Sequence, residues 1–266
     1  MTLLVGTSGW QYADWRGVFY PPGVPQRKWL DHYANTFATV ELNAAFYRPV
    51  KPETFANWRD RTPGDFVMAV KASRVITHYR RLRDPDVPLD RVLGAARELG
   101  DKLGPILFQL PPDLEAVPDR LRDMLDLIPR QLRVVVEPRH ASWWTPAVRS
   151  VLADHGAALC WADRHNRPTS PLWHTTDWAY LRFHESTGAR APGYPDRTLE
   201  RWIGRLDHIC GRKQDAYVYF NNDRGGNAIH DAARFAELAR AAGWPVARAG
   251  REATTESGGH AVVQRG

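Results

Sequence analysis

Short apolar segments alternate with amphipathic segments along almost the whole chain, and this alternation restricts the fold more than any other feature. Most of the apolar segments are separated by stretches with apolar residues at helical spacing, such as Leu199, Trp202 and Leu206. Strands that alternate with helices, without a linker between them, predict an α/β protein with a single (β/α)8 TIM barrel over residues 1–250. Eight segments have the length and composition of strands: residues 2–7, 39–43, 66–71, 106–110, 134–136, 158–163, 178–184 and 216–221.

Two parts of the chain depart from this repeat. Residues 164–176 contain Pro168 and Pro171 and leave no room for a full helix, which predicts an irregular connection between the sixth and seventh strands. Residues 251–266 are rich in Gly, Ser, Thr and Arg without periodicity, and we expect a loose C-terminal tail there. The alternative fold is an open doubly wound sheet. No GxGxxG or GxxxxGKS/T motif follows a strand, which weakens the nucleotide-binding version of that alternative.

Composition and charge restrict the class of protein further. Hydrophobic residues make up 43% of the chain and charged residues 25%, as in a folded globular protein. The net charge of +6 is compatible with an anionic partner. Cys160 and Cys210 are far apart and have no CxxC spacing, so we expect neither a disulfide framework nor a structural zinc site. The N-terminal residues lack the features of a signal peptide or membrane span, and the cytoplasm is the expected location.

Polar side chains stand where the predicted strands end. The fifth strand shows this most clearly, because its valines are followed at once by Glu137, Pro138 and Arg139. In a barrel the carboxyl ends of all strands meet at one face, which carries the site in barrel enzymes. The polar residues at these ends are Glu41, Asn43, Lys71, Gln109, Glu137, Arg139, Asp163, Arg182, His184, Asn221 and Asn222.

Several longer motifs make the sequence resemble the DUF72 family, also called the YecE-like family. The resemblance extends from Gly6 to about Ala242. It implies a cytoplasmic (β/α)8 barrel, and it implies no particular reaction, because the family has no established biochemical activity. The motifs are GTSGWQYADWRGVFYP (6–21), FATVELNAAFYR (37–48), KASRVITH (71–78), KLGPILFQLPP (102–112), VEPRHASWW (136–144), LRFH (181–184) and YVYFNN (217–222).

Two carboxylates at opposite strands are candidates for proton transfer. Glu137 and Glu41 have the chemistry of a general acid and base, with His184 as a third catalytic candidate. The alternative is that both carboxylates only anchor ion pairs, Glu137 with Arg139 or Arg182, and Glu41 with Lys71. Replacement of Glu137 by Gln distinguishes the two. Lost turnover at an unchanged melting temperature favours catalysis, and a collapse of stability favours the ion pair.

The remaining candidates form a predicted binding site for a small anionic molecule, such as a phosphorylated one. Lys71, Arg139 and Arg182 are suited to clamp a phosphate or carboxylate, unless they only neutralise neighbouring acids. A Schiff-base role for Lys71 requires a desolvated amine, which the sequence does not show. The other predicted substrate-binding residues are Asn43, Tyr47, Gln109, His140, Trp143, Asp163, Asn221 and Tyr12.

Two further functions remain open. Oxygen and nitrogen donors suited to a divalent metal, as in a metal-dependent phosphoesterase, are present at Glu41, Glu137, Asp163, His140 and His184. No local HxH or HExxH spacing supports a metal site, and no cofactor is predicted. Alternatively, the basic segment 74–83 and exposed aromatic residues bind nucleic acid, with an affinity that falls steeply with salt. The loop aromatics that either stack a ligand or only cover the barrel are Tyr12, Trp15, Tyr20, Tyr47, Trp143 and Trp144. The leading hypothesis is an enzyme with acid/base chemistry on a small anionic substrate.

Overall fold

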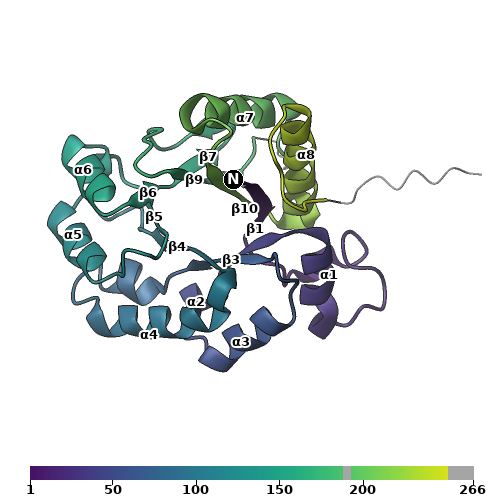
Figure 1. The fold of residues 1–266 in the computed structure, drawn as a ribbon, viewed down its shortest axis with the longest axis horizontal. Helices are drawn as coiled ribbons and strands as arrows, with labels where there is room; N and C mark the ends of the chain where they lie inside the picture. The colour runs from purple at the N-terminus through teal and green to yellow at the C-terminus, as the bar shows by residue number, and fades with distance from the viewer. Residues whose placement is uncertain (188–192, 251–266) are drawn as a thin grey trace, which may run out of the picture.

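A computed structural model describes residues 1–187 and 193–250. The predicted C-terminal tail, residues 251–266, lies outside this part of the chain. The strands form two five-stranded sheets around a central axis, with the helices on the outside (Figure 1). Neighbouring strands are parallel except for β7 and β8, so the predicted α/β class with parallel sheets is confirmed.

One sheet contains β1 together with β7 to β10, and the other contains β2 to β6. The first sheet has the order β1 (Leu3–Thr7), β10 (Asp215–Phe220), β9 (Trp178–Glu185), β7 (Trp161–Arg164) and β8 (Arg167–Pro168). The second has the order β2 (Thr39–Leu42), β3 (Val67–Lys71), β4 (Leu103–Gln109), β5 (Val134–Glu137) and β6 (Ala157–Leu159). In the described residues, backbone hydrogen bonds do not join these strands into the single closed sheet that the sequence predicts.

Helices cover the outside of both sheets. Thr145 begins one of them as a side-chain cap, because its Oγ1 accepts a hydrogen bond from the Val148 amide at 3.3 Å and Pro146 occupies the first turn. The α-helices are α1 (Trp29–Thr36), α2 (Ala44–Tyr47), α3 (Pro52–Asp60), α4 (Asp86–Ala96), α5 (Pro118–Asp126), α6 (Pro146–Asp154), α7 (Asp196–Cys210) and α8 (Asn227–Ala241). Shorter helical turns are η1 (Ala13–Trp15), η2 (Gln26–Lys28), η3 (Val75–Tyr79), η4 (Arg97–Lys102), η5 (Ala141–Trp143) and η6 (Arg224–Gly226).

A tyrosine hydroxyl occupies the gap between β1 and β2, where one sheet meets the other. The Tyr33 hydroxyl accepts a hydrogen bond from the Thr7 amide at 2.9 Å and donates one to the Thr39 carbonyl at 3.0 Å. It therefore links two backbone groups that would bond directly in a closed sheet. The strands are close here, since a Cβ on Gly6 would lie 2.3 Å from the Thr39 carbonyl oxygen.

The predicted sixth strand, residues 158–163, is divided between the two sheets. It breaks at Cys160, so that β6 pairs with β5 and β7 pairs with β9. The irregular connection that follows supplies replacement partners for the backbone. Thr175 Oγ1 donates to the Ala157 carbonyl at 2.7 Å, and Ser170 Oγ donates to the Cys160 carbonyl at 3.2 Å. The hydroxyl groups of the proline-containing loop thus bond to backbone carbonyls that the break in the strand leaves without a strand partner.

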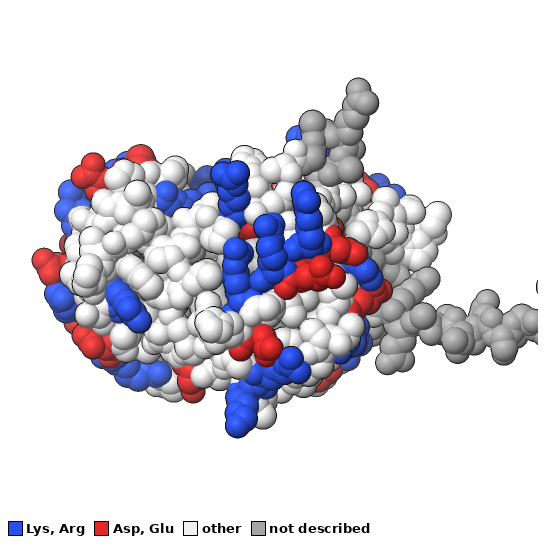
Figure 2. Space-filling model, turned by 90° about the horizontal axis from the view of Figure 1, so that it is seen from above, with Lys and Arg blue, Asp and Glu red and all other residues white. Residues whose placement is uncertain are grey.

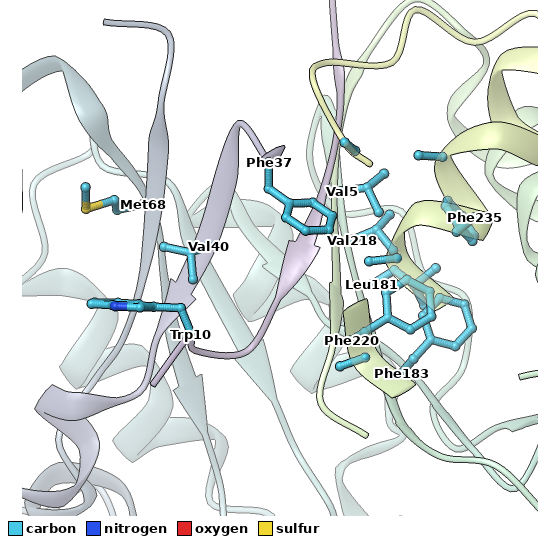
Figure 3. Close-up of a cluster of buried hydrophobic side chains, with 14 of the residues drawn as sticks. Val5, Trp10, Phe37, Val40, Met68, Leu181, Phe183, Val218, Phe220 and Phe235 are labelled. Atoms are coloured by element: carbon cyan, nitrogen blue, oxygen red, sulfur yellow. The ribbon is translucent and has the colours of Figure 1, made fainter. Parts of the chain in front are cut away.

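Alternation along the strands separates an interior from an outer layer. Leu4, Val135 and Tyr180 belong to a buried cluster that draws on both sheets. Their neighbours in sequence point outward and pack under the helices. Figure 3 shows part of the outer layer, in which Val5, Val218 and Phe220 lie on the side of the first sheet that faces Phe235 of α8.

The inward positions become charged toward the carboxyl ends of the strands. Two residues beyond Val135 the inward position is Glu137, and two beyond Tyr180 it is Arg182. An apolar interior therefore ends in a polar layer. None of the helices in the described ranges combines the length and apolar character that a membrane crossing requires.

Candidate functional site

A cavity of about 590 Å³ lies at the carboxyl ends of the strands, where the sequence predicts the site. Its volume is in the range of pockets that hold small molecules. Residues from both sheets and from the loops that follow them line it: Asn43, Phe46, Tyr47, Lys71, His78, Gln109, Arg139, Arg164, His184, Glu185, Ser186, Asn221, Asn222, Asp223 and Arg224.

Arg182 holds two carboxylates from the other sheet, and these three residues do not themselves line the cavity. Its Nη1 donates to Glu137 Oε2 at 2.6 Å, and its Nη2 donates to Glu41 Oε1 at 2.8 Å. Tyr180 donates to the second oxygen of Glu41 at 2.7 Å. The alternative pairing of Glu41 with Lys71 is wrong, because Arg182 reaches from β9 across the interior and takes that place.

The Glu137 carboxylate accepts hydrogen bonds from four side chains. Gln109 Nε2 and Arg182 bond to Oε2, at 2.9 and 2.6 Å, while His184 Nε2 and Arg139 Nε contact Oε1, at 2.8 and 3.2 Å. Burial opposes ionisation, but the charges of Arg182 and the other donors outweigh it and hold the pKa of Glu137 well below its usual range. Glu137 is therefore a fixed anion in the folded protein.

His184 is oriented by this anion and faces the cavity. Because a carboxylate only accepts hydrogen bonds, Nε2 carries the proton of the neutral ring, and Nδ1 is left as an acceptor. No described residue forms a hydrogen bond with Nδ1. Burial lowers the pKa of His184, against the opposing effect of Glu137. The neutral ring can thus accept a hydrogen bond at Nδ1.

Lys71 lines the cavity without a hydrogen bond or ion pair to any described residue. Its Nζ lies 3.9 Å from the centre of the Phe46 ring, and only 7% of the residue is exposed. Burial, together with the charge of Arg182, lowers the pKa of the Lys71 amine to about 8. The desolvated amine that the sequence could not show is therefore present.

Positive side chains outnumber negative ones in the cavity wall. The lining includes Lys71, Arg139, Arg164 and Arg224 against the acids Glu185 and Asp223. A concave surface with this excess attracts anions.

Seven of the predicted site residues lie together in the cavity wall: Asn43, Tyr47, Lys71, Gln109, Arg139, His184 and Asn221. Three more, Glu41, Glu137 and Arg182, form the buried ionic group beside it. Sequence and structure thus converge on one region of the molecule.

Four predicted binding residues lie outside the cavity wall. Asp163 points outward and accepts a hydrogen bond from Trp202 of α7 at 2.7 Å. Trp143 is fully buried and donates to the Leu114 carbonyl at 2.7 Å. His140 Nδ1 accepts from the Ser142 amide and so caps η5. Tyr12 donates to the backbone carbonyl of Ser8.

The candidate metal donors are also separated, since Asp163 and His140 serve these structural contacts. No group of three or more His, Cys, Asp or Glu side chains that could hold a metal occurs in the described ranges. Of the six loop aromatics, Tyr47 is the one in the cavity wall, while Trp15, Tyr20 and Trp143 are fully buried.

Seven lining residues are not among the residues that the sequence singles out for the site: Phe46, His78, Arg164, Glu185, Ser186, Asp223 and Arg224. Asn222 also lines the cavity and stands at a predicted strand end. The run NNDRGGN directly after β10 is a signal for Asp223 and Arg224, because it is polar and follows a strand end. Phe46 lies on α2 and His78 on η3, two short helical segments whose course the sequence does not reveal.

The same fold and sequence pattern occur in other proteins. A protein of Bacillus subtilis strain 168 named UPF0759 protein YunF is 25% identical over 272 residues, which cover 89% of this chain and 94% of that protein. UPF0759 protein YecE of Escherichia coli K12 is 28% identical over 144 residues, which cover 53% of this chain and 50% of that protein.

Solved structures show the same similarity. A DUF72 family protein of Thermotoga maritima MSB8 has a TM-score of 0.80 and 26% identity, covering 90% of this chain and 100% of that one. A DUF72 family protein of Enterococcus faecalis V583 has a TM-score of 0.74 at 17% identity, over 90% of this chain and 96% of that one, and it shows the shared fold alone. The sequence model described as "Protein of unknown function DUF72" matches residues 4–255. This chain therefore belongs to the DUF72 family.

Proposed function

We propose that the chain is an enzyme that binds a small anionic molecule, phosphorylated or carboxylated, in the cavity at the carboxyl ends of its strands. The observation that carries this proposal is the excess of cationic side chains in the cavity wall, of which Lys71 has no anionic partner among the described residues. A bound phosphate or carboxylate supplies that partner.

His184 is the group that moves a proton in this proposal. Its free Nδ1 accepts a proton from the bound molecule, and the fixed charge of Glu137 at Nε2 stabilises the imidazolium that results. Glu137 thus acts through His184 and is a positioning residue. Glu41 holds Arg182 in place from β2, and Glu137 needs no proton exchange of its own.

We also propose that the two sheets together form the wall of one (β/α)8 barrel. The support is the close approach of β1 and β2, where Ser8 and Glu41 form an isolated bridge, and the continuous chain from β6 to β7 through Cys160. The interior cluster with side chains from both sheets is the layer that such a barrel requires.

Binding of nucleic acid has less support from the surface. Figure 2, seen from above relative to Figure 1, shows Lys and Arg side chains beside Asp and Glu side chains on this face. In the basic segment 74–83, Arg81 pairs with Asp113. Charges that are already neutralised locally contribute little to polyanion binding.

Titration with inorganic phosphate tests the proposed site. Arg164 and Arg224 line the cavity, whereas Arg149 on α6 is exposed and lies outside the lining. At constant ionic strength, phosphate is expected to raise the thermal unfolding midpoint of the wild type and of the control Arg149→Gln. Arg164→Gln and Arg224→Gln should lose most of this rise. Equal rises in all four proteins, or no rise in the wild type, contradict the proposal.

A further inference from the structure

Lys71 differs from the other partly buried lysine of the chain in having no oxygen partner. The Nζ of Lys102 donates to the carbonyls of Arg59 and Thr62, both at 2.6 Å. Lys71 has no such acceptor in the described residues, although it is more deeply buried. An amine that lines a cavity without a protein acceptor is open to a bound molecule, so its position suggests a use in the cavity.

The surroundings of Lys71 keep its amine uncharged more often than that of an exposed lysine. Burial, to which the Phe46 ring at 3.9 Å contributes, and the nearby charge of Arg182 disfavour the protonated amine, against the opposing charges of Glu41 and Glu137. With the pKa at about 8, roughly one amine in ten is neutral at pH 7. A neutral amine has the lone pair that a nucleophile requires, and desolvation is one of the ways in which catalytic lysines are activated.

We propose that Lys71 is a nucleophile that forms a Schiff base with the carbonyl carbon of a small anionic ketone or aldehyde bound in the cavity. This inference rests on the proposed anion site and names the substrate class for it. The cationic wall, with Arg164 and Arg224, holds the phosphate or carboxylate of the substrate. Lys71, at the end of β3, then contacts the carbonyl group of the bound substrate.

The step balances without an oxidant or reductant. The nitrogen lone pair of Lys71 forms a bond to the carbonyl carbon, the carbonyl π pair moves to oxygen, and that oxygen takes a proton. The nitrogen loses a proton to give a neutral carbinolamine. Its hydroxyl group then leaves with a second proton as water, and a carbon–nitrogen double bond remains. Amine and carbonyl compound thus give imine and water.

His184 is placed to move the protons of this step. It lines the same cavity, and its Nδ1 has no hydrogen-bond partner among the described residues. It accepts the proton that leaves the nitrogen and returns one to the departing hydroxyl group. Once protonated, the imine withdraws electrons from the adjacent carbon, which assists removal of a proton or cleavage of a carbon–carbon bond there.

Reductive trapping tests the nucleophile directly. The wild type is incubated with pyruvate or dihydroxyacetone phosphate and sodium cyanoborohydride, and the labelled lysines are located by peptide mass spectrometry. The chain has five lysines, at positions 28, 51, 71, 102 and 213, so each can be quantified. We expect the reduced adduct on Lys71 at least tenfold above the other four, with competition by inorganic phosphate.

Variants separate a nucleophile from an anion-binding cation. Lys71→Arg keeps the charge, so phosphate should still stabilise this variant, but the variant should form no adduct at position 71. The control variant Lys213→Arg should form the adduct on Lys71 as the wild type does. Lys71→Met serves as a second variant if Lys71→Arg does not fold. Absence of an adduct on Lys71 with both probes, or equal labelling of all five lysines, overturns the nucleophile. If phosphate still stabilises the wild type in that case, the anion site stands alone. If phosphate does not bind either, both proposals fail.

Discussion

The Nη1 atom of Arg182 lies 2.6 Å from Oε2 of Glu137, and neither side chain is more than 2% exposed. The same guanidinium bonds to Glu41 through its other terminal nitrogen at 2.8 Å. Transfer of each ion from water into the protein costs several kcal/mol, which only such mutual pairing offsets. Because Arg182 belongs to one sheet and the two carboxylates to the other, the pairing also couples the sheets.

Replacement of Glu137 by Gln should destabilise the protein strongly. The carboxylate receives four donors, and an amide would turn an NH2 group toward two of them while leaving Arg182 short of one negative charge. We expect a loss of about 3–5 kcal/mol in the free energy of unfolding, measured by urea denaturation at pH 7. Glu185→Gln, at an exposed lining residue, is the control and should change it by less than about 0.5 kcal/mol. A Glu137→Gln protein as stable as the wild type would show that the ionic group is not structural.

The pH dependence of stability should reveal the desolvated amine of Lys71. Its pKa is about 8 in the folded protein, against about 10.4 for an unfolded chain. Between these two pH values the unfolded state binds more protons than the folded state, so the free energy of unfolding rises with pH. This gain in stability is lost again as the pH falls toward 8 and below. Relative to Lys71→Met, the wild type should gain about 3 kcal/mol between pH 7 and pH 10.5 in urea denaturation. Parallel curves for the two proteins would mean that the amine is solvated.

The order of strands and helices could be predicted because it depends on the local period of apolar residues. The division into two sheets could not, because it depends on single hydroxyl groups from distant segments. Tyr33 replaces a backbone partner at one gap, and Ser170 and Thr175 do so at the other. The sequence pattern does not distinguish these hydroxyls from those of ordinary helix and loop residues.

The polar residues at strand ends were predictable for a similar reason, but their roles were not. Glu41 and Lys71 have opposite charges at neighbouring strands, which makes them a reasonable pair from the sequence. The actual partner of Glu41 is Arg182, whose long side chain crosses the interior from the other sheet. The sequence pattern does not specify which long side chain reaches a given carboxylate. Asp163 is predicted as a binding residue but points outward, because both faces of its strand are apolar and alternation alone does not choose the face.

Replacement of Asp163 by Asn should therefore leave the cavity unchanged. Burial raises the pKa of Asp163, although its hydrogen bond from Trp202 opposes this effect. A raised pKa in the folded state means that stability falls as pH rises through it, because the ionised form is disfavoured there. Asn keeps an oxygen for Trp202 and carries no charge. We expect stability at pH 7 that equals the wild type or exceeds it by up to about 1 kcal/mol, with unchanged stabilisation by phosphate. Weaker phosphate binding by this variant would show that Asp163 does contribute to the binding site.

Replacement of Gly6 by Ala tests the closure between β1 and β2. The new Cβ would lie 2.3 Å from the Thr39 carbonyl oxygen and 3.1 Å from the Tyr33 hydroxyl. Since the first of these atoms is backbone, relief requires the two strands to move apart, which also breaks the hydrogen bonds through Tyr33. We expect a loss of about 1–3 kcal/mol in the free energy of unfolding.

The matched control is Gly204→Ala on the exposed side of α7, where a Cβ has no neighbour within 4 Å. That variant should be unchanged or more stable by about 0.5–1 kcal/mol, because alanine favours the helix. If Gly6→Ala instead unfolded at the same urea concentration as the wild type, the two strands would have room to separate. The sheets would then be joined at this gap by the Tyr33 side chain and not by close backbone packing, and a closed barrel wall would have lost its main support.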